Sequence, residues 1–140
     1  MLTLKHAVSK ADIIITSKWS RDAFLFSDLI KEGAHITTLG PDKPNKAEVS
    51  SELINKSLFV CDDKELAVSM GAIGGVGLDE QSIDAEIGEV IENHQLGRTR
   101  GDQITIYGMV GLPFQDLIAA WLVYKKAEEL KLGTRMNFLQ

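Results

Sequence analysis

The stretch Ala11-Asp12-Ile13-Ile14-Ile15-Thr16 is the first of four short apolar runs that decide the fold expected for this chain. The others are His35 to Leu39, Leu58 to Cys61 and Gln103 to Tyr107. The runs are nearly continuous in hydrophobic, largely β-branched residues. Such continuity, in place of strict alternation, is typical of a sheet that is covered on both faces. We therefore expect four buried strands.

Segments with a helical pattern separate these runs. They are Asp22 to Lys31, Lys46 to Asn55, Lys64 to Met70 and Ser82 to His94. Gly33 suits the end of the first of them, and Ser82 suits the N-cap of the last. Strands that alternate with helices predict an α/β domain with a mostly parallel sheet, flanking helices and right-handed crossovers.

The last predicted helix is the clearest one. Pro113 suits its first position and Gly133 suits its end. Its apolar side chains recur at three- and four-residue spacings, as in Phe114, Leu117, Ile118, Trp121, Leu122 and Leu130. Such a stripe predicts that this face of the helix packs in a hydrophobic core.

Composition narrows the class of protein. The chain has 140 residues, of which 44% are hydrophobic and 25% charged, as in one ordinary globular domain. A net charge of −5 gives no broad attraction to nucleic acid. No apolar run approaches the ~18 residues that a membrane span needs, and the N-terminus has no signal-peptide pattern. Cys61 is the only cysteine, so we expect a buried small hydrophobe and a cytoplasmic, reducing location.

The glycine-rich segment Gly71 to Gly77 resembles a phosphate-binding loop. It does not fit G-x-G-x-x-G, and it follows a helical stretch, whereas a phosphate loop follows a strand. We expect a flexible surface loop.

Polar residues at two strand ends are the first candidates for a site, because ligands of parallel sheets bind beyond the carboxyl ends of the strands. Thr16 closes the first run, and Gly40-Pro41-Asp42 closes the second. Lys46 lies four residues beyond Asp42, close enough to pair with it or to hold an anion. The alternative is that Asp42 caps a helix that begins near Lys46.

Metal-binding and nucleophilic patterns are weak. Asp62-Asp63 follows the third run, where a solvated loop or a helix N-cap is the favoured interpretation. His6, His35 and His94 lie far apart and show no ligand spacing. We predict no metal site.

Four stretches, in order and at compatible spacing, resemble the C-terminal half of the ornithine cyclodeaminase/mu-crystallin family. The first is the run ending in Thr16, and the second is Gly33 to Glu48, similar to G-x-H…G-x-D-x-P-G-K-x-E. The third is Ala85 to Ile91 with Gly97-Arg98, similar to A-E-L-G-E…G-R. The fourth is Ile104 to Leu112 with Gln115-Asp116, similar to I-T-x-F-D-S-V-G-L…Q-D.

The resemblance implies an incomplete Rossmann-like, doubly wound sheet that binds NAD, with NADP as the alternative. It implies that Asp42 is the catalytic aspartate, a general acid/base. The positions that match cofactor contacts are Thr16, Leu39, Gly40, Pro41 and Lys46. Val110 matches the substrate side.

The activity that the resemblance implies is NAD-dependent ornithine cyclodeamination. In that reaction hydride leaves the substrate Cα, ammonia is lost, and the cyclic imine is reduced to proline. Relatives reduce ketimines or interconvert keto acids and amino acids, so a ketimine reductase or amino-acid dehydrogenase is the alternative. A non-catalytic small-molecule-binding or assembly module is another. In each case the expected partner is a small amino or imino acid.

Departures from the family pattern limit these expectations. Asn45 replaces the usual glycine, and Asn tolerates left-handed geometry. Gly108-Met109 replaces Asp-Ser. The G-x-G-x-x-G unit and the substrate domain have no counterpart in this sequence. We therefore expect residues 1–140 to be one domain, the C-terminal part of a nucleotide-binding domain that ends in a long helix, inactive by itself and prone to self-association through an unpaired sheet edge.

Overall fold

The four apolar runs form strands of one parallel sheet. The computed structural model describes residues 3–137. Its sheet has the order β1-β2-β5-β3-β4, and every paired strand is parallel to its neighbour. The strands are β1 (Ile13–Thr16), β2 (His35–Thr38), β3 (Leu58–Cys61), β4 (Ala85–Glu86) and β5 (Thr105–Gly108). The predicted α/β class and the four predicted strands are confirmed, and β4 is an addition.

Register aligns the apolar side chains across the sheet. Ile14 pairs with Ile36, Ile36 with Ile106, and Ile106 with Phe59. All four of these side chains are buried. One row of β-branched and aromatic residues therefore crosses the sheet and forms the centre of the core.

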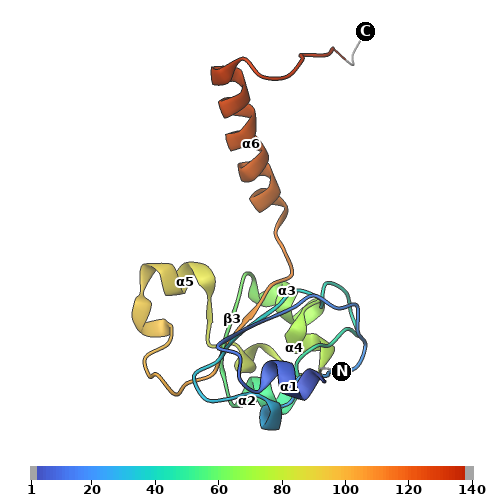
Figure 1. Cartoon of the computed structure of the whole chain (residues 1–140), viewed down its shortest axis with the longest axis vertical. Helices are drawn as coiled ribbons and strands as arrows, with labels where there is room; N and C mark the ends of the chain where they lie inside the picture. Colours follow the sequence, from blue (N-terminus) through green and yellow to red (C-terminus); the bar gives the residue numbers. More distant parts are fainter. Residues whose placement is uncertain (1–2, 138–140) are drawn as a thin grey trace. The chain divides into compact units, whose positions relative to one another are not determined.

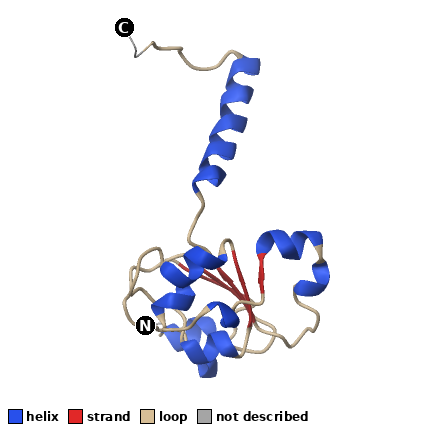
Figure 2. Ribbon diagram, turned by 180° about the vertical axis from the view of Figure 1, so that it is seen from behind, coloured by secondary structure: helices blue, strands red, loops and turns tan. Residues whose placement is uncertain are grey.

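Short helices cover this buried face. They are α1 (Leu4–Val8), α2 (Ser51–Asn55), α3 (Lys64–Ser69) and α4 (Ala72–Gly75). Residues from α2, α3 and α4, among them Leu53, Ala67 and Ile73, pack in the same cluster as the strand row. Figure 2 shows the strands side by side with helices packed along them.

The other face of the sheet is less covered than its sequence predicts. Ile13 and Ile15 of the edge strand β1 are 67% and 68% exposed, and His35, Thr37 and Tyr107 on the same face are only partly buried. The expectation of a sheet covered on both faces is wrong for the described residues. The apolar run of β1 still forms a strand, because β-branched residues favour extended backbone on either face.

One of the predicted helices is replaced by an extended segment, and another is shortened. Asp22 to Lys31 contains only the 3₁₀ turn η1 (Ser27–Leu29), because the amides of Phe24 and Leu25 donate to the carbonyl of Glu48 and not to a helical partner. The helix expected from Lys46 begins only at Ser51, where Ser50 accepts from the amide of Leu53 at 3.2 Å. A parallel bridge between Leu25 and Val49 holds the two extended segments together.

The segment Ser82 to His94 is also divided. It contains part of η2 (Glu80–Ser82), then β4, then α5 (Ile87–Glu92), and it ends at η3 (His94–Leu96). Asp84 accepts the amide of Phe59 at 2.7 Å, which draws the chain beside β3. Glu86 and Glu89 then form a capping box at the start of α5. Ser82 is therefore not the N-cap, because sheet pairing takes the residues that follow it.

The glycine-rich segment is packed backbone and not a flexible surface loop. Ala72 and Ile73 of α4 are buried. A Cβ on Gly74 would lie 1.7 Å from the carbonyl oxygen of Val68, and one on Gly75 would lie 1.8 Å from that of Lys46. These two glycines are required because α4 lies directly against other main chain.

The chain divides into two units, one that contains the sheet and ends at Val110, and one that begins at Gly111 and contains α6 (Pro113–Leu130). Figure 1 shows both. Pro113 lies at the start of α6, as predicted. The helix ends at Leu130, and Lys131 is its left-handed C-cap, so the expectation that Gly133 ends the helix is wrong by two residues. No described helix is both long and apolar enough to cross a membrane.

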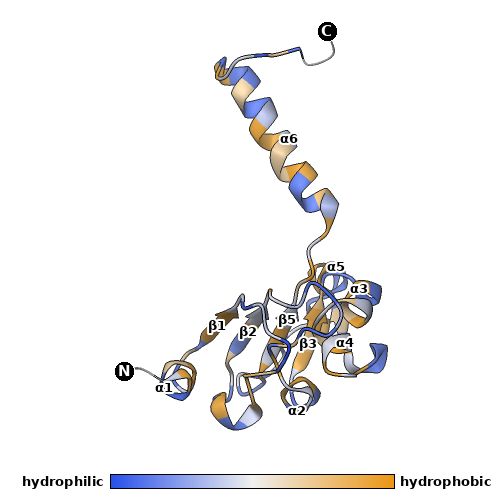
Figure 3. Ribbon diagram, turned by 90° about the vertical axis from the view of Figure 1, so that its right-hand side faces the viewer, coloured by the Kyte–Doolittle hydropathy of each residue, from blue (hydrophilic) through white to orange (hydrophobic). Residues whose placement is uncertain are grey.

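The apolar stripe of α6 has no buried side chain within its own unit, so its core packing stays a prediction. Leu117, Trp121 and Leu122 are 68%, 57% and 62% exposed. Figure 3 shows hydrophobic segments along this helix. Helical periodicity identifies an apolar face, but it does not identify what covers that face.

We expect this exposed apolar surface to drive self-association. Light scattering should give a mass above that of the monomer, and Leu117→Glu should lower the association constant by about tenfold or more, because it places a charge in the apolar stripe. Lys125→Glu, on an exposed position of the same helix, is the control and should leave the mass unchanged. A wild-type chain that stays monomeric at high concentration would contradict this prediction.

Candidate functional site

The carboxyl ends of β1 and β2 bring most of the predicted site residues together. The amide of Leu39 donates to the carbonyl of Thr16 at 2.9 Å, so the two strand ends stay joined beyond the sheet. Thr16 is buried, whereas Leu39 is 38% exposed. Gly40, Pro41 and Asp42 follow Leu39 directly. The side chain of Lys46 also lies at this edge, because its ammonium donates to the Asp42 carboxylate. The edge predicted from strand-end logic is therefore the edge where these residues lie.

Asp42 and Lys46 form an ion pair at this edge. The Lys46 Nζ lies 2.5 Å from the Asp42 Oδ1, and the side chains are 7% and 50% exposed respectively. The Lys46 Nζ also lies 5.2 Å from the ring centroid of Trp19. The hydrogen bond from Lys46 is the main cause that holds the pKa of Asp42 below its ordinary value. Asp42 is thus an ionised carboxylate with half of its surface open.

The turn between them has the geometry that its sequence requires. Asn45 has φ 64°, which confirms the expectation that it takes the left-handed conformation normally given to glycine. No helix begins near Lys46, because α2 begins at Ser51. The alternative in which Asp42 caps such a helix is therefore wrong.

A buried carboxylate that sequence analysis did not select lies at the centre of the site. Glu48 has no exposed surface. Its Oε2 accepts from the hydroxyls of Thr16 and Thr38 at 2.6 and 2.7 Å and from the amide of Gly40 at 3.1 Å. Its Oε1 accepts from the amide of Lys18. One carboxylate thus joins both strand ends to the loop after β1.

Gly40 is required because it lies against this carboxylate. A Cβ at Gly40 would lie 2.3 Å from the Glu48 Oε1 and 2.3 Å from the carbonyl oxygen of Lys18. Pro41 beside it is fully buried. Neither Gly40 nor Pro41 has a polar side chain. Both residues therefore act on the site by setting the course of the main chain between β2 and Asp42.

Asp62 and Val110 lie at the ends of β3 and β5. The Asp62 carboxylate accepts from the amide of Val110 at 3.1 Å and from that of Asp63 at 3.1 Å. The main-chain amide of Val110 is therefore already bonded to Asp62. A ligand contact made by Val110 would use its apolar side chain. Substrate contact by Val110 stays a prediction. Asp63 accepts from the amide of Leu66 and caps α3, which confirms the capping interpretation.

Cys61 is inert in this fold. It is buried, and burial raises the pKa of its thiol to about 12. The thiolate is the reactive form of cysteine, and a raised pKa removes it at neutral pH. The expectation of a buried small hydrophobe is confirmed.

The G-R stretch lies at the opposite, amino edge of the sheet. Arg98 donates to the carbonyls of Gly33 and Ala34 at 2.8 and 3.1 Å and to the Thr105 hydroxyl at 3.0 Å. His35 lies beside it, with its Nδ1 2.8 Å from the same hydroxyl. Burial and then the charge of Arg98 lower the pKa of His35. Arg98 thus links the start of β2 to the start of β5 by hydrogen bonds.

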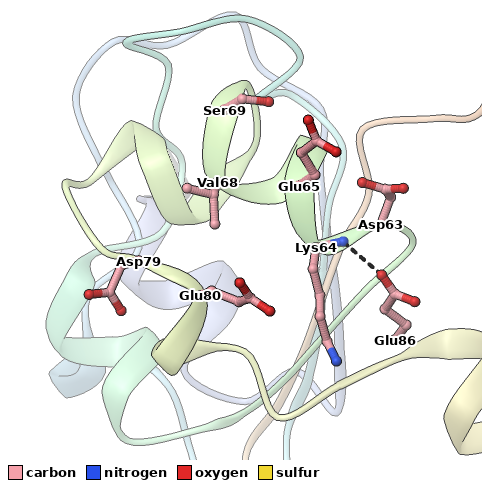
Figure 4. Close-up of a pocket in the computed structure, with 8 residues that line it drawn as sticks. All are labelled: Asp63, Lys64, Glu65, Val68, Ser69, Asp79, Glu80 and Glu86. Atoms are coloured by element: carbon pink, nitrogen blue, oxygen red, sulfur yellow. Dashed lines mark hydrogen bonds between the residues drawn. The ribbon is translucent and has the colours of Figure 1, made fainter.

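A shallow hollow of about 740 Å³ lies between α3 and β4 (Figure 4). Its lining residues are Asp63, Lys64, Glu65, Val68, Ser69, Asp79, Glu80 and Glu86. Figure 4 shows the carboxylates spread around the rim, with the main-chain amide of Lys64 donating a hydrogen bond to the Glu86 carboxylate. Within the described residues, no three His, Cys, Asp or Glu side chains are grouped as metal ligands. This hollow shares no lining residue with the Asp42 site.

Substitution of Gly40 should destabilise the fold. Gly40→Ala is expected to lower the free energy of unfolding by about 2 to 3 kcal/mol, because the added methyl overlaps the Glu48 carboxylate and the Lys18 main chain. Gly88→Ala in α5 is the matched control, since a Cβ there meets nothing within 4 Å. It should be neutral or stabilise by up to about 1 kcal/mol. Equal effects of the two substitutions in urea titrations would refute this account of Gly40.

Known proteins share this fold. The delta(1)-pyrroline-2-carboxylate reductase of Bacillus cereus is 36% identical over 139 residues, which cover 95% of this chain and 42% of that protein. An archaeal alanine dehydrogenase dimer with bound NAD matches with a TM-score of 0.89 and 33% identity, over 99% of this chain and 44% of that one.

A third similar protein is the delta(1)-pyrroline-2-carboxylate reductase of Thermococcus litoralis, solved in complex with NADH and L-proline. It matches with a TM-score of 0.88 and 31% identity, over 97% of this chain and 44% of that chain. This chain therefore spans less than half the length of the relatives that it matches.

The family model covers almost the whole chain. The model described as the ornithine cyclodeaminase/mu-crystallin family matches residues 2–131. That range includes all five strands, the ion pair of Asp42 and the buried Glu48. The parallel sheet, the order of the motifs and this match agree, and the chain belongs to the ornithine cyclodeaminase/mu-crystallin family.

Proposed function

We propose that this chain is the C-terminal part of the nucleotide-binding domain of an NAD-dependent oxidoreductase that interconverts an imino acid and an amino acid. The observation that carries the proposal is the half-exposed Asp42 carboxylate, held by Lys46 at the carboxyl edge of the sheet. The names of the pyrroline-2-carboxylate reductases and the alanine dehydrogenase support this activity. They favour the reductase or dehydrogenase alternative over ornithine cyclodeamination, which the family description alone supports.

The residues at this edge fit the nicotinamide end of such a cofactor. Leu39 and Trp19 are exposed hydrophobic side chains beside the strand ends, and flat rings bind against surfaces of this kind. Lys46 supplies a cation, and Thr16 supplies a hydroxyl oxygen. The nicotinamide, when bound, supplies or accepts the hydride. NAD is the expected cofactor, since the similar solved structures hold NAD or NADH.

An ionised Asp42 suits one part of this chemistry. Hydride adds readily to the carbon of a protonated imine, because the positive charge on nitrogen makes that carbon electrophilic. A carboxylate that accepts a hydrogen bond from the iminium N–H stabilises this charge. In the reverse direction the same carboxylate can take a proton from the substrate ammonium group, as a general base. The lowered pKa of Asp42 keeps it in the form that both tasks require.

The substrate and its remaining contacts are expected to lie with residues outside this chain. The relatives are more than twice as long as the part that matches. We propose a small imino or amino acid as substrate, with the Val110 side chain on its side of the site. A second copy of the chain is the expected partner.

Binding and turnover test the proposal. Calorimetric titration of this chain with NADH should show saturable binding at millimolar or lower concentration. In a full-length parent that reduces delta(1)-pyrroline-2-carboxylate with NADH, followed at 340 nm, Asp42→Asn should lower kcat about 100-fold or more, because the neutral amide stabilises an iminium poorly. Asp28→Asn, at an exposed position of η1, is the control. No heat of binding at millimolar NADH, or unchanged kcat in Asp42→Asn, would contradict the proposal.

Carbon-detected NMR titration of Asp42 tests its ion pair. The midpoint should lie below that of an ordinary aspartate, and Lys46→Met should raise it, because Lys46 is the main cause of the lowered pKa. Lys43→Met should raise it less, since Lys43 contributes least among the causes. A group whose pKa falls on folding stabilises the fold above its unfolded pKa, and this contribution is lost as pH falls through the folded pKa. Equal midpoints in wild type and Lys46→Met would contradict the assignment.

A further inference from the structure

The carboxylate of Glu48 occupies a cradle of four hydrogen-bond donors. Two of them are the hydroxyls of Thr16 and Thr38, and two are the main-chain amides of Gly40 and Lys18. The carboxylate is fully buried. Convergent amides and hydroxyls of this kind are what proteins use to bind phosphate and other anions. Here the chain fills such a cradle with its own side chain.

The burial of this charge is compensated by hydrogen bonds alone. Within the described residues, no lysine, arginine or histidine forms a salt bridge with Glu48. A buried carboxylate without a cation is costly unless its oxygens accept several hydrogen bonds. The four donors come from the end of β1, the end of β2 and the loop between Thr16 and Ser20. The charge therefore ties the loop after β1 and the turn after β2, through Lys18 and Gly40, to strand ends that already pair at Thr16 and Thr38.

We infer that Glu48 is a positioning residue, an internal anion that fixes the strand ends and the turn carrying Asp42 and Lys46. The amide of Gly40 contacts the Glu48 side chain and so closes the segment from 40 to 48 into a loop. Asp42 lies two residues after the start of this loop, and Lys46 lies two residues before its end. The consequence for the site rests on the function proposed above.

The cradle also determines which part of a ligand binds beside it. A threonine hydroxyl has one hydrogen, and in Thr16 and Thr38 Glu48 accepts it. The oxygens can then only accept from a ligand, and the amides of Lys18 and Gly40 are engaged as well. A phosphate next to Glu48 would meet a like charge and no free donor among these four groups. A dinucleotide group beside Thr16 would therefore have to be uncharged and to donate a hydrogen bond, as a carboxamide NH₂ or a ribose hydroxyl does.

Rescue by an added carboxylate tests the internal anion. Glu48→Ala leaves the four donors around an empty space, so its melting temperature should fall, and formate should restore part of it beyond the effect of chloride at equal ionic strength. Glu52→Ala is the matched control, because Glu52 is an exposed acid that pairs with Lys56 on α2. Formate should not raise its melting temperature relative to chloride. Equal responses to formate in the two variants would overturn the proposal.

Glu48→Gln keeps the shape of the side chain and removes its charge, so it serves also if Glu48→Ala does not fold. The amide NH₂ would face donors, so the loop should shift and the NMR midpoint of Asp42 should rise toward its ordinary value. The Kd for NADH should rise about tenfold. An unchanged Asp42 midpoint in Glu48→Gln would overturn the positioning role. Failure of the wild-type chain to bind NADH would reject the proposed function, while the formate and midpoint results would still decide on Glu48.

Discussion

One buried carboxylate connects most of the features that distinguish this chain from a generic parallel sheet. The side chain of Glu48 holds the ends of β1 and β2 and the loop after β1. Its main-chain carbonyl accepts from the amides of Phe24 and Leu25 at 3.0 and 2.9 Å. The side chain and the main chain of Glu48 therefore both hold segments in place at the carboxyl edge of the sheet. Because a buried charge that loses its partners costs far more than an ordinary contact, this arrangement is sharply defined.

This constraint also explains where prediction from sequence succeeded and failed. The strands were predictable, because runs such as Ile13 to Thr16 are β-branched and need only neighbours to pair with. The helices expected at Asp22 to Lys31 and from Lys46 were not, because the backbone groups of these segments bond to each other through Glu48 and Val49. Periodicity records which residues are apolar, but it cannot record a hydrogen bond to a residue more than twenty positions away.

The candidate site was also predictable only in part. Thr16, Asp42 and Lys46 lie together, as the logic of parallel strand ends predicts. Glu48 was not selected, since an acid shortly after a lysine is usually a solvated surface residue. Two signals were available in the sequence: its apolar neighbours Ala47 and Val49, and its place as the final acid of the G-x-D-x-P-G-K-x-E pattern. Burial of a polar side chain is a property of the tertiary structure, so sequence alone could not determine it.

Two surfaces of this chain expose apolar side chains to solvent. The outer side chains of β1 and the apolar stripe of α6 are exposed, although both have the composition of a core. The relatives of this family are more than twice the length of the matching part. Apolar side chains exposed in this way are candidate contacts for further protein. A second copy of this chain is the occupant that we expect.

Native-state hydrogen exchange of the Lys18 and Gly40 amides tests the central role of Glu48 most directly. Neither amide belongs to a strand or a helix, and both donate to this buried carboxylate. The account predicts exchange slowed to rates like those of the β2 amides in the wild-type chain, and faster exchange of these two amides in Glu48→Gln. Exchange of both amides at the rate of an unstructured peptide in the wild-type chain would contradict it.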